Sequence, residues 1–336
     1  MSQSSKFRRF IKPLIIVNSI FSTGLIEYFI DYNINMIGIV YALTFSIFFV
    51  SIMCLYPYST FIYDDKQALL MNVMHALYFY NCYASYIFPI ITGFLRRKKI
   101  KRFMLQTETC IRSMEQLNIP MNLSKYFWQQ YYVILALIIT VLIVLVCEIR
   151  ILLLYGMSYW IVFVIFFLCR YHVIILLIND FSFMFWMGVM KMKFSQLNEL
   201  LKSMLTTTID SPQHKRVFRW GNVRMNDHAS SEIRRTYKSR KDVRRIRKGR
   251  EIHLEIIKCA RNINDAYGLY ILFSITTALN TITISSYGLY SFLKNKNDVV
   301  QLVPVLTPLY WVAHFVIKIM MISHLCARTI TEVCSL

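Results

Sequence analysis

The chain is poor in charged residues, and this excludes a soluble enzyme or a secreted scaffold. Asp, Glu, Lys and Arg make up 17% of its 336 residues, against about a quarter in a soluble globular protein. Hydrophobic residues account for 56% of the chain, and the mean hydropathy is +0.46. The polar residues gather in a few blocks between long apolar stretches. This distribution predicts a protein that crosses a membrane several times.

The sequence also lacks the common motifs of enzyme active sites. It has no phosphate-binding loop of the form G-x-x-x-x-G-K-[ST], no H-E-x-x-H pair and no G-x-S-x-G elbow. The 8 cysteines are scattered without a C-x-x-C pair, which argues against a disulfide framework and a zinc site. We therefore predict that the chain is not an enzyme and binds no metal or cofactor.

Six apolar segments are long enough to cross a bilayer, which takes about 20 residues per helix. They are residues 36–56, 69–95, 128–155, 158–190, 263–293 and 303–326. Residues 11–30 form a more polar segment with Pro13, Asn18 and Glu27, and we predict an interfacial or re-entrant helix there rather than a span. The predicted fold class is all-α, a polytopic transmembrane helix bundle.

Positive charge is distributed unevenly between the two sides of these spans. One side holds the N-terminus and residues 96–125 and 191–261, and it carries 31 Lys and Arg residues against 4 on the other side. Cytoplasmic loops carry the excess of Lys and Arg in membrane proteins. We therefore predict that the N-terminus and both long loops are cytoplasmic.

The longest predicted loop, residues 206–250, is strongly basic, with 14 Lys and Arg residues between Lys215 and Arg250. We predict a cytoplasmic insert that is flexible or partly helical. Its charge run can serve to bind RNA, anionic lipid or a regulator, or it can be a solvated loop that sets the topology. Only Trp220 and Tyr237 supply the aromatic rings that a nucleic-acid surface needs, so we favour the solvated loop and expect no nucleic-acid partner.

Polar and aromatic residues in the outer halves of the predicted spans suggest a ligand pocket between the helices on the extracellular side. Polar groups are costly in lipid unless they face protein or water, and ligand pockets combine apolar and aromatic walls with a few polar groups. The alternative is that these groups only pair between helices, extend to the interface or cap helix ends. Our candidate ligand-binding residues come from four spans: Tyr83, Arg170, Tyr287, Trp311 and His314.

Three short motifs resemble those of the insect gustatory receptors, which are seven-transmembrane chemosensory receptors. The first follows an Arg/Lys-Phe-x-x-Leu-Asn pattern at the end of the fourth predicted span, and the others lie in the fifth and sixth. The residues that carry the resemblance are Lys193, Phe194, Leu197 and Asn198; Asn264, Tyr267 and Gly268; and Trp311, Lys318, Cys326, Thr331 and Glu332. The motifs, the order of the spans and the short outer loops carry the resemblance together. It covers most of the chain from about Met36 onward.

The resemblance implies a single transmembrane chemoreceptor domain over residues 1–336, located in the plasma membrane. Such proteins resemble ligand-gated cation channels that bind small-molecule tastants and assemble as homo- or hetero-tetramers with other receptor subunits in the lipid bilayer. The alternatives are an odorant receptor of the same superfamily and a small-solute transporter. The motifs at Lys193 and Asn264 favour the gustatory branch, and no internal repeat supports a transporter.

The family also has a seventh helix, with a Thr-Tyr-x5-Gln-Phe signature, that lines the central pore of the tetramer. The chain shows no such motif after the sixth predicted span. We therefore expect a ligand-binding bundle that is truncated before the pore-lining helix.

Overall fold

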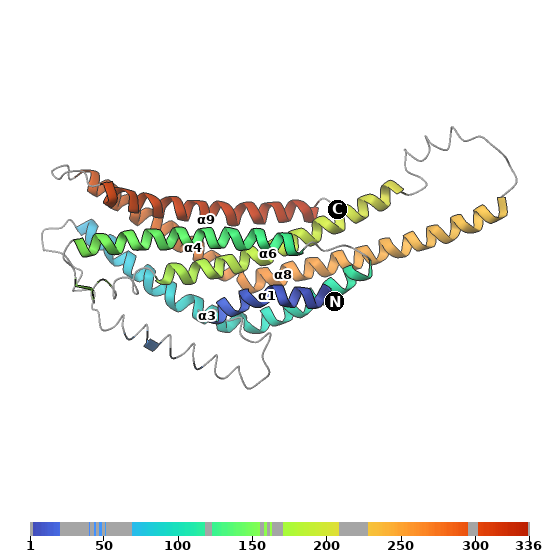
Figure 1. Ribbon diagram of the computed structural model, residues 1–336, viewed down its shortest axis with the longest axis horizontal. Coiled ribbons are helices and arrows are strands. Elements are labelled where there is room, and N and C mark those ends of the chain that lie inside the picture. The colour runs from blue at the N-terminus through green and yellow to red at the C-terminus, as the bar shows by residue number, and fades with distance from the viewer. Residues whose placement is uncertain are drawn as a thin grey trace.

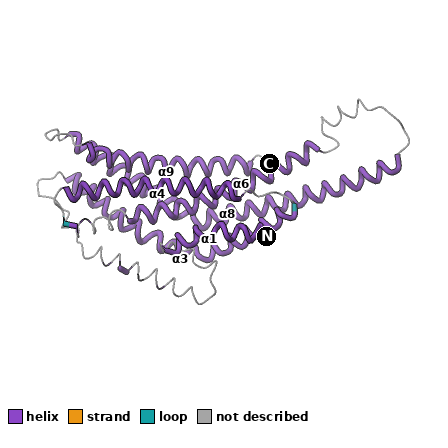
Figure 2. The backbone as a smooth tube through the Cα atoms, viewed as in Figure 1, coloured by secondary structure: helices purple, strands orange, loops and turns teal. Residues whose placement is uncertain are grey.

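Each long segment of the chain that the structure describes is an α-helix. The computed structural model describes residues 3–20, 69–117, 123–154, 171–207, 228–294 and 302–334, with isolated positions at 40–51 and 158–162. The helices are α1 (Gln3–Ile20), α3 (Leu69–Gln116), α4 (Leu123–Leu154), α6 (Tyr171–Thr207), α8 (His228–Lys294) and α9 (Leu302–Cys334). No strand occurs among the described residues (Figure 2), and the predicted all-α bundle is confirmed. The predicted span at residues 36–56 lies almost wholly outside them.

The long helices run along one axis in alternating directions (Figure 1). α3, α6 and α9 run toward the end of the bundle where α1 starts, whereas α4 and α8 run away from it. α8 contacts α3, α6 and α9, and α6 contacts α3 and α9, so these four helices form the packed centre. The connections after α3 and α6 therefore share one end with the N-terminus. This is the end that the charge bias predicts to be cytoplasmic.

Three of the described helices are long and apolar enough to cross a membrane. The qualifying segments are His172–Lys202 in α6, Val243–Ser291 in α8 and Val305–Cys334 in α9. They overlap the predicted spans at residues 158–190, 263–293 and 303–326. α3 and α4 occupy the positions of the predicted spans at residues 69–95 and 128–155.

α1 is not among these three segments, and it begins at Gln3 rather than at residue 11. It contacts α3 and α6, and it buries Phe7 and Ile11 completely. Trp186 on α6 is the centre of this packing, because its ring meets Phe7 at 6.5 Å and Phe103 at 4.9 Å between centroids. α1 is therefore held by the bundle core.

The basic loop is partly helical. α8 has 67 residues, which at 1.5 Å per residue makes a helix about 100 Å long, against about 30 Å for the hydrocarbon core of a bilayer. Its first part extends well past the bundle (Figure 1) and contains residues 228–250 of the predicted insert 206–250. Residues 208–227 lie outside the described residues.

α4 presents an apolar surface on the outside of the bundle. Leu135, Leu142, Ile143 and Val146 are each exposed by 50% or more, and α4 contacts α9. Side chains of this kind are stable in contact with lipid tails, which are as apolar as leucine. The exposed face of α4 is therefore consistent with a lipid-facing surface.

The alternating helices and the charge bias predict the accessibility of tags. An epitope tag at the N-terminus or beside Arg240 should be shielded in intact cells, because both positions lie at the basic end. A tag beside Asn297, between α8 and α9, should be accessible. Antibody labelling with and without permeabilisation measures this, and labelling beside Arg240 in intact cells would contradict the orientation.

Candidate functional site

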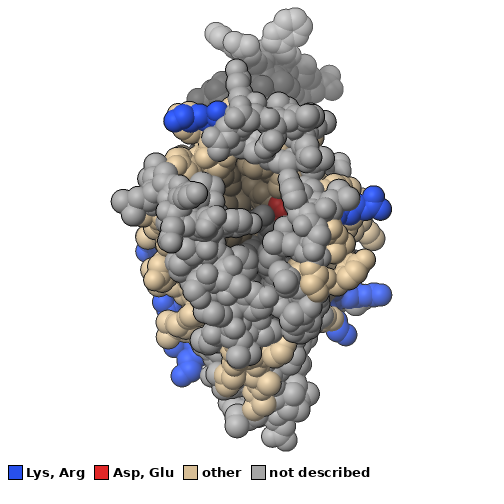
Figure 3. Space-filling view, turned by 90° about the vertical axis from the view of Figure 1, so that its left-hand side faces the viewer, with Lys and Arg blue, Asp and Glu red and all other residues tan. Residues whose placement is uncertain are grey.

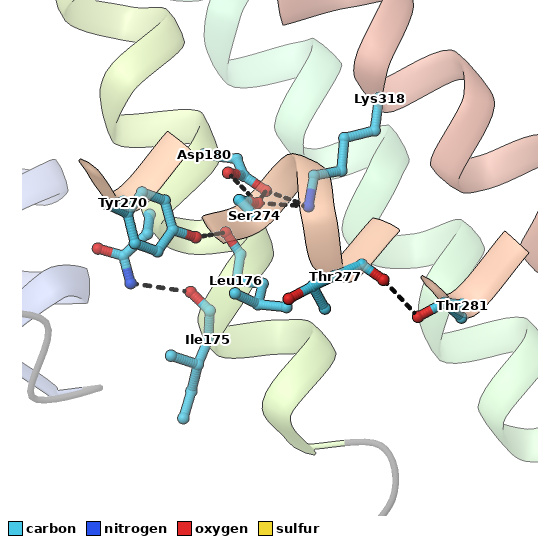
Figure 4. A network of polar contacts seen from close by, with 9 residues as sticks. Ile175, Leu176, Asp180, Tyr270, Ser274, Thr277, Thr281 and Lys318 are labelled. Atoms are coloured by element: carbon cyan, nitrogen blue, oxygen red, sulfur yellow. Dashed lines mark hydrogen bonds and ion pairs between the residues drawn. The ribbon is translucent and has the colours of Figure 1, made fainter. Parts of the chain in front are cut away.

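An ion pair lies buried between α6, α8 and α9 (Figure 4). The Lys318 ammonium on α9 is 2.6 Å from Oδ2 of Asp180 on α6, and the two side chains are 10% and 3% exposed. Ser274 on α8 completes the contact. Its hydroxyl donates to Oδ1 of Asp180 at 2.8 Å and accepts from Nζ of Lys318 at 2.7 Å. One polar contact therefore joins three helices.

Asp180 is a residue of this ion pair that the sequence analysis missed. Lys318 was named in the sequence analysis because it belongs to a resembling motif. Asp180, which follows Asn179 within the predicted span 158–190, was not named. A carboxylate inside an apolar span was itself the available signal, because a charged group at the centre of a membrane is costly unless it is paired. The identity of its partner depends on how three helices pack, which spacing along one helix does not give.

A second buried cation lies beside this ion pair. Arg96 on α3 is 2% exposed and donates to Oδ1 of Asn179. Its guanidinium carbon lies 4.6 Å from the ring centroid of Tyr267 and 5.4 Å from that of Tyr270. The Tyr270 hydroxyl donates to the carbonyl of Leu176 at 2.9 Å. α3 is thereby joined to α6 and α8 at the same level of the bundle.

A cavity of about 190 Å³ lies against the ion pair, between α4, α6 and α9. Its polar lining groups are Thr140, Asp180, Tyr310, His314 and Lys318. The rest of the lining is apolar and consists of Val173, Leu176, Leu177, Phe181, Met184, Ala313, Phe315, Ile317 and Met321. Apolar walls with a few polar groups are typical of small-molecule sites.

The molecule is also hollowed at the end of the bundle opposite the N-terminus (Figure 3). An acidic side chain, coloured red, is visible in the wall of this hollow. Tan, uncharged side chains are also visible in the depth of the hollow.

The structure places four of the five candidate ligand-binding residues, and they lie on three helices. His314 lines the cavity, and Trp311, one turn earlier on α9, is buried and donates from Nε1 to Oε1 of Glu148 on α4 at 2.7 Å. Tyr83 on α3 and Tyr287 on α8 are half-buried and lie on helices that do not line the cavity. Arg170 lies outside the described residues. Ligand binding by these five residues stays a prediction.

The motif at the end of the fourth predicted span packs into the bundle at the end that holds the N-terminus. Lys193 is fully buried, donates to the carbonyl of Thr107 on α3 at 3.4 Å and lies 5.9 Å from the Phe7 ring centroid. Burial raises the pKa of the nearby Cys110 thiol, and the Lys193 charge offsets part of this rise. The Cys110 thiol therefore stays protonated near neutral pH, which makes it a poor nucleophile.

Two of the resembling motifs meet in space. The side-chain amide of Asn198 on α6 donates to the backbone carbonyl of Glu332 on α9 at 2.9 Å and to Oε2 of the same residue at 3.3 Å. Phe194 and Leu197 are fully buried, and the Phe194 ring lies 5.5 Å from the imidazole of His253 on α8. These motif residues therefore join α6 to α8 and α9 at the end of the bundle that holds the N-terminus.

The remaining motif residues have varied surroundings. Tyr267 is fully buried beneath Arg96, whereas Asn264 is exposed. A Cβ added to Gly268 would meet Oδ1 of Asn264 at 3.5 Å, which is an ordinary contact distance. Cys326 is half-buried and Thr331 is exposed. In the described part of the chain, no group of three or more His, Cys, Asp or Glu residues is placed to hold a metal ion.

Comparison with known proteins identifies the family. No curated protein matches the chain. The sequence profile of the 7tm chemosensory receptors matches residues 21–336, which is most of the chain. This match agrees with the all-helical bundle, the membrane-spanning segments and the resembling motifs at Lys193, Asn264 and Lys318. The chain belongs to the 7tm chemosensory receptor family.

Proposed function

We propose that this chemosensory receptor is a gustatory receptor of the plasma membrane, a subunit of a tetrameric cation channel that is gated by small-molecule tastants. The observation that carries the proposal is the cavity between α4, α6 and α9, with apolar walls and a buried ion pair in its lining. The gustatory-type motifs at Lys193 and Asn264 support the taste branch over the odorant branch. No described feature favours the transporter alternative.

The geometry suggests how ligand binding is coupled to channel opening. A ligand shifts an equilibrium only if it binds the two states with different affinity. The cavity is lined by residues of three helices, and two of them, α6 and α9, are also joined by Asp180 and Lys318. A bound tastant therefore contacts the same helices whose relative positions the ion pair holds.

The test is to fill the cavity. Val173 is 4% exposed and lines it, so Val173→Trp should occupy the space that a ligand needs. We expect tastant-evoked current to fall at least about tenfold in cells that express the chain together with a family subunit that carries the pore-lining helix, because an overfilled site rejects its ligand by more than 1.4 kcal/mol. A panel of sucrose, fructose, caffeine and quinine serves as the ligand set.

Val146→Trp is the matched control. Val146 is 56% exposed on the apolar face of α4, so this variant should keep both surface expression and current. Full current from Val173→Trp would contradict a ligand site in this cavity. Currents evoked by volatile odorants and by none of the four tastants would favour the odorant alternative, and solute uptake without conductance would favour the transporter.

A further inference from the structure

The exposed face of α3 changes from apolar to basic within one helical turn. Ile91 and Leu95 are 51% and 71% exposed. Lys98 and Arg102 follow on the same face at helical spacing, and both are exposed. Exposed apolar side chains are stable against lipid tails, whereas Lys and Arg are stable at the level of the lipid headgroups. The edge of the bilayer therefore meets α3 between Leu95 and Lys98.

α1 brings a further cation to the same level of the bundle. The rings of Phe7 on α1 and Phe103 on α3 both meet the ring of Trp186. Lys12 follows Phe7 by five residues, and Lys98 precedes Phe103 by five residues. Because α1 and α3 run in opposite directions (Figure 1), both lysines lie about 7.5 Å from these contacts, toward the apolar part of the bundle. Lys12 is exposed as well.

The exposed cations of these two helices form a basic collar around one side of the bundle. It consists of Lys98, Lys99, Lys101 and Arg102 on α3 and of Arg9 and Lys12 on α1. Asp and Glu are absent from residues 3–20 and 69–107, and none of the described residues forms an ion pair with a collar cation. On α8, by contrast, Arg247 and Lys258 pair with Glu251 and Glu255. The charge of the collar is therefore left for a partner outside the chain.

The spacing of the collar favours a partner with several negative charges. Its four cations on α3 fall within five consecutive residues, about 6 Å along the helix axis. A headgroup with one charge balances one of them, whereas the ring phosphates of an inositol phospholipid bring several charges close together. Lys binds phosphate as a point charge, and Arg102 can bind it through two parallel hydrogen bonds. Clusters of Lys and Arg directly cytoplasmic of a span are typical binding sites for such lipids.

The basic part of α8 lies too far from the headgroups to bind them in the same way. Lys99 donates to the backbone carbonyl of Asp265 at 3.2 Å, which places Asp265 at the level of the collar. Arg250 and Arg244 precede Asp265 by 15 and 21 residues, or about 22 Å and 32 Å along α8. Both distances exceed the Debye length of about 8 Å at physiological ionic strength. The exposed arginines of α8 therefore provide a control of the same charge at another place.

We propose that the basic collar binds the headgroup of an inositol phospholipid with two or more ring phosphates, in the leaflet on the side that the charge bias predicts to be cytoplasmic. The acyl chains lie along Ile91 and Leu95, which are exposed directly beyond Lys98. The lipid joins α1 to α3 from outside the bundle, as Trp186 does from inside. The proposal adds a specific lipid to the proposed function, and it depends neither on the tastant nor on the cavity.

Native mass spectrometry of the purified full chain tests the proposal, because each bound molecule adds its own mass. The protein in a neutral detergent is titrated with dioleoyl phosphatidylinositol bisphosphate, dioleoyl phosphatidylserine and free inositol trisphosphate. We expect the bisphosphate lipid to bind at least about tenfold more tightly than either of the others. Phosphatidylserine has too little charge, and inositol trisphosphate has no acyl chain to bury against the apolar face of α3.

Two variants remove the collar cations of one helix at a time. Lys98→Gln combined with Lys101→Gln and Arg102→Gln should weaken binding of the bisphosphate lipid at least about tenfold, because each Lys or Arg beside the headgroups adds to the attraction. Arg9→Gln combined with Lys12→Gln should weaken it at least about fivefold for the same reason. All five side chains are exposed, so both variants should keep the thermal unfolding midpoint of the unaltered chain without lipid.

The matched control combines Arg244→Gln, Arg245→Gln and Arg250→Gln, which removes three exposed cations from α8. It should keep the affinity for the bisphosphate lipid within about twofold. Equal affinity for phosphatidylserine or for inositol trisphosphate would overturn the proposal, and so would equal losses in this control and in the α3 variant. Unchanged affinity after Arg9→Gln and Lys12→Gln would also overturn it, because the site is proposed across both helices. None of these results bears on tastant-evoked current, so a failure here is distinct from a failure of the proposed function.

Discussion

Asp180→Ala is expected to lower the free energy of unfolding by about 3–5 kcal/mol, the usual cost of removing one partner from a buried ion pair. The loss is large because Lys318 would lose its oppositely charged partner at a site where its side chain is 10% exposed. Ser274 would also lose the carboxylate that accepts from its hydroxyl. Titration of the purified protein with sodium dodecyl sulfate in mixed micelles measures the change.

Two further variants test whether the unpaired charge causes this loss of stability. Asp180→Leu combined with Lys318→Met removes both charges and should recover most of the lost stability, since apolar replacement of a whole buried pair is often neutral or better. Asp265→Ala removes an exposed carboxylate from α8 and should change the stability by less than about 0.5 kcal/mol. Equal losses in the single and the paired variant would show that Asp180 acts through packing and not through its charge.

Much of the fold was predictable because the membrane constrains it strongly. A segment that crosses lipid must satisfy its backbone hydrogen bonds internally, so long apolar stretches predict helices with little ambiguity. α8 and α9 contain the predicted spans 263–293 and 303–326, and α6 contains residues 171–190 of the predicted span 158–190. Helix ends are less constrained, because helices continue into water wherever the sequence allows it, as α8 does back to His228.

The interior of the bundle was less predictable, because hydropathy does not say which polar groups meet. The motif residues Asn198 and Glu332 were found separately by resemblance, and only the structure shows that one donates to the other. Lys318 was found and its partner Asp180 was not. Contacts between residues more than 100 positions apart, or between three helices, depend on helix rotation and register. A single sequence does not contain this information in readable form.

Arg96 illustrates the same limit in a run of basic residues. Arg96, Arg97, Lys98 and Lys99 follow one another at the end of the predicted span 69–95, and all were counted as charges that set the orientation. Lys98 and Lys99 are exposed, as such charges should be, whereas Arg96 is 2% exposed. The turn of α3 points one member of the run into the core. Arg96 therefore contributes to the interior of the fold. A topology prediction, which only counts charges, cannot distinguish Arg96 from its neighbours.

Arg96→Ala is accordingly expected to lower the free energy of unfolding by about 3 kcal/mol, through loss of a charged hydrogen bond to Asn179 and of contacts with two aromatic rings. Arg96→Lys should recover little of this, because an ammonium cannot present the flat face that stacks on Tyr267 while also donating to Asn179. The same titration in mixed micelles measures both variants.

Arg102→Ala is the matched control, since Arg102 belongs to the same basic cluster on α3 but is exposed. It should change the stability by less than about 0.5 kcal/mol. All three variants should keep the same orientation in the membrane, because removal of one charge leaves the bias of 31 to 4 almost unchanged. A loss of stability that is equal for Arg96→Ala and Arg102→Ala would mean that the cluster acts through its total charge, and the buried contacts of Arg96 would then contribute nothing measurable.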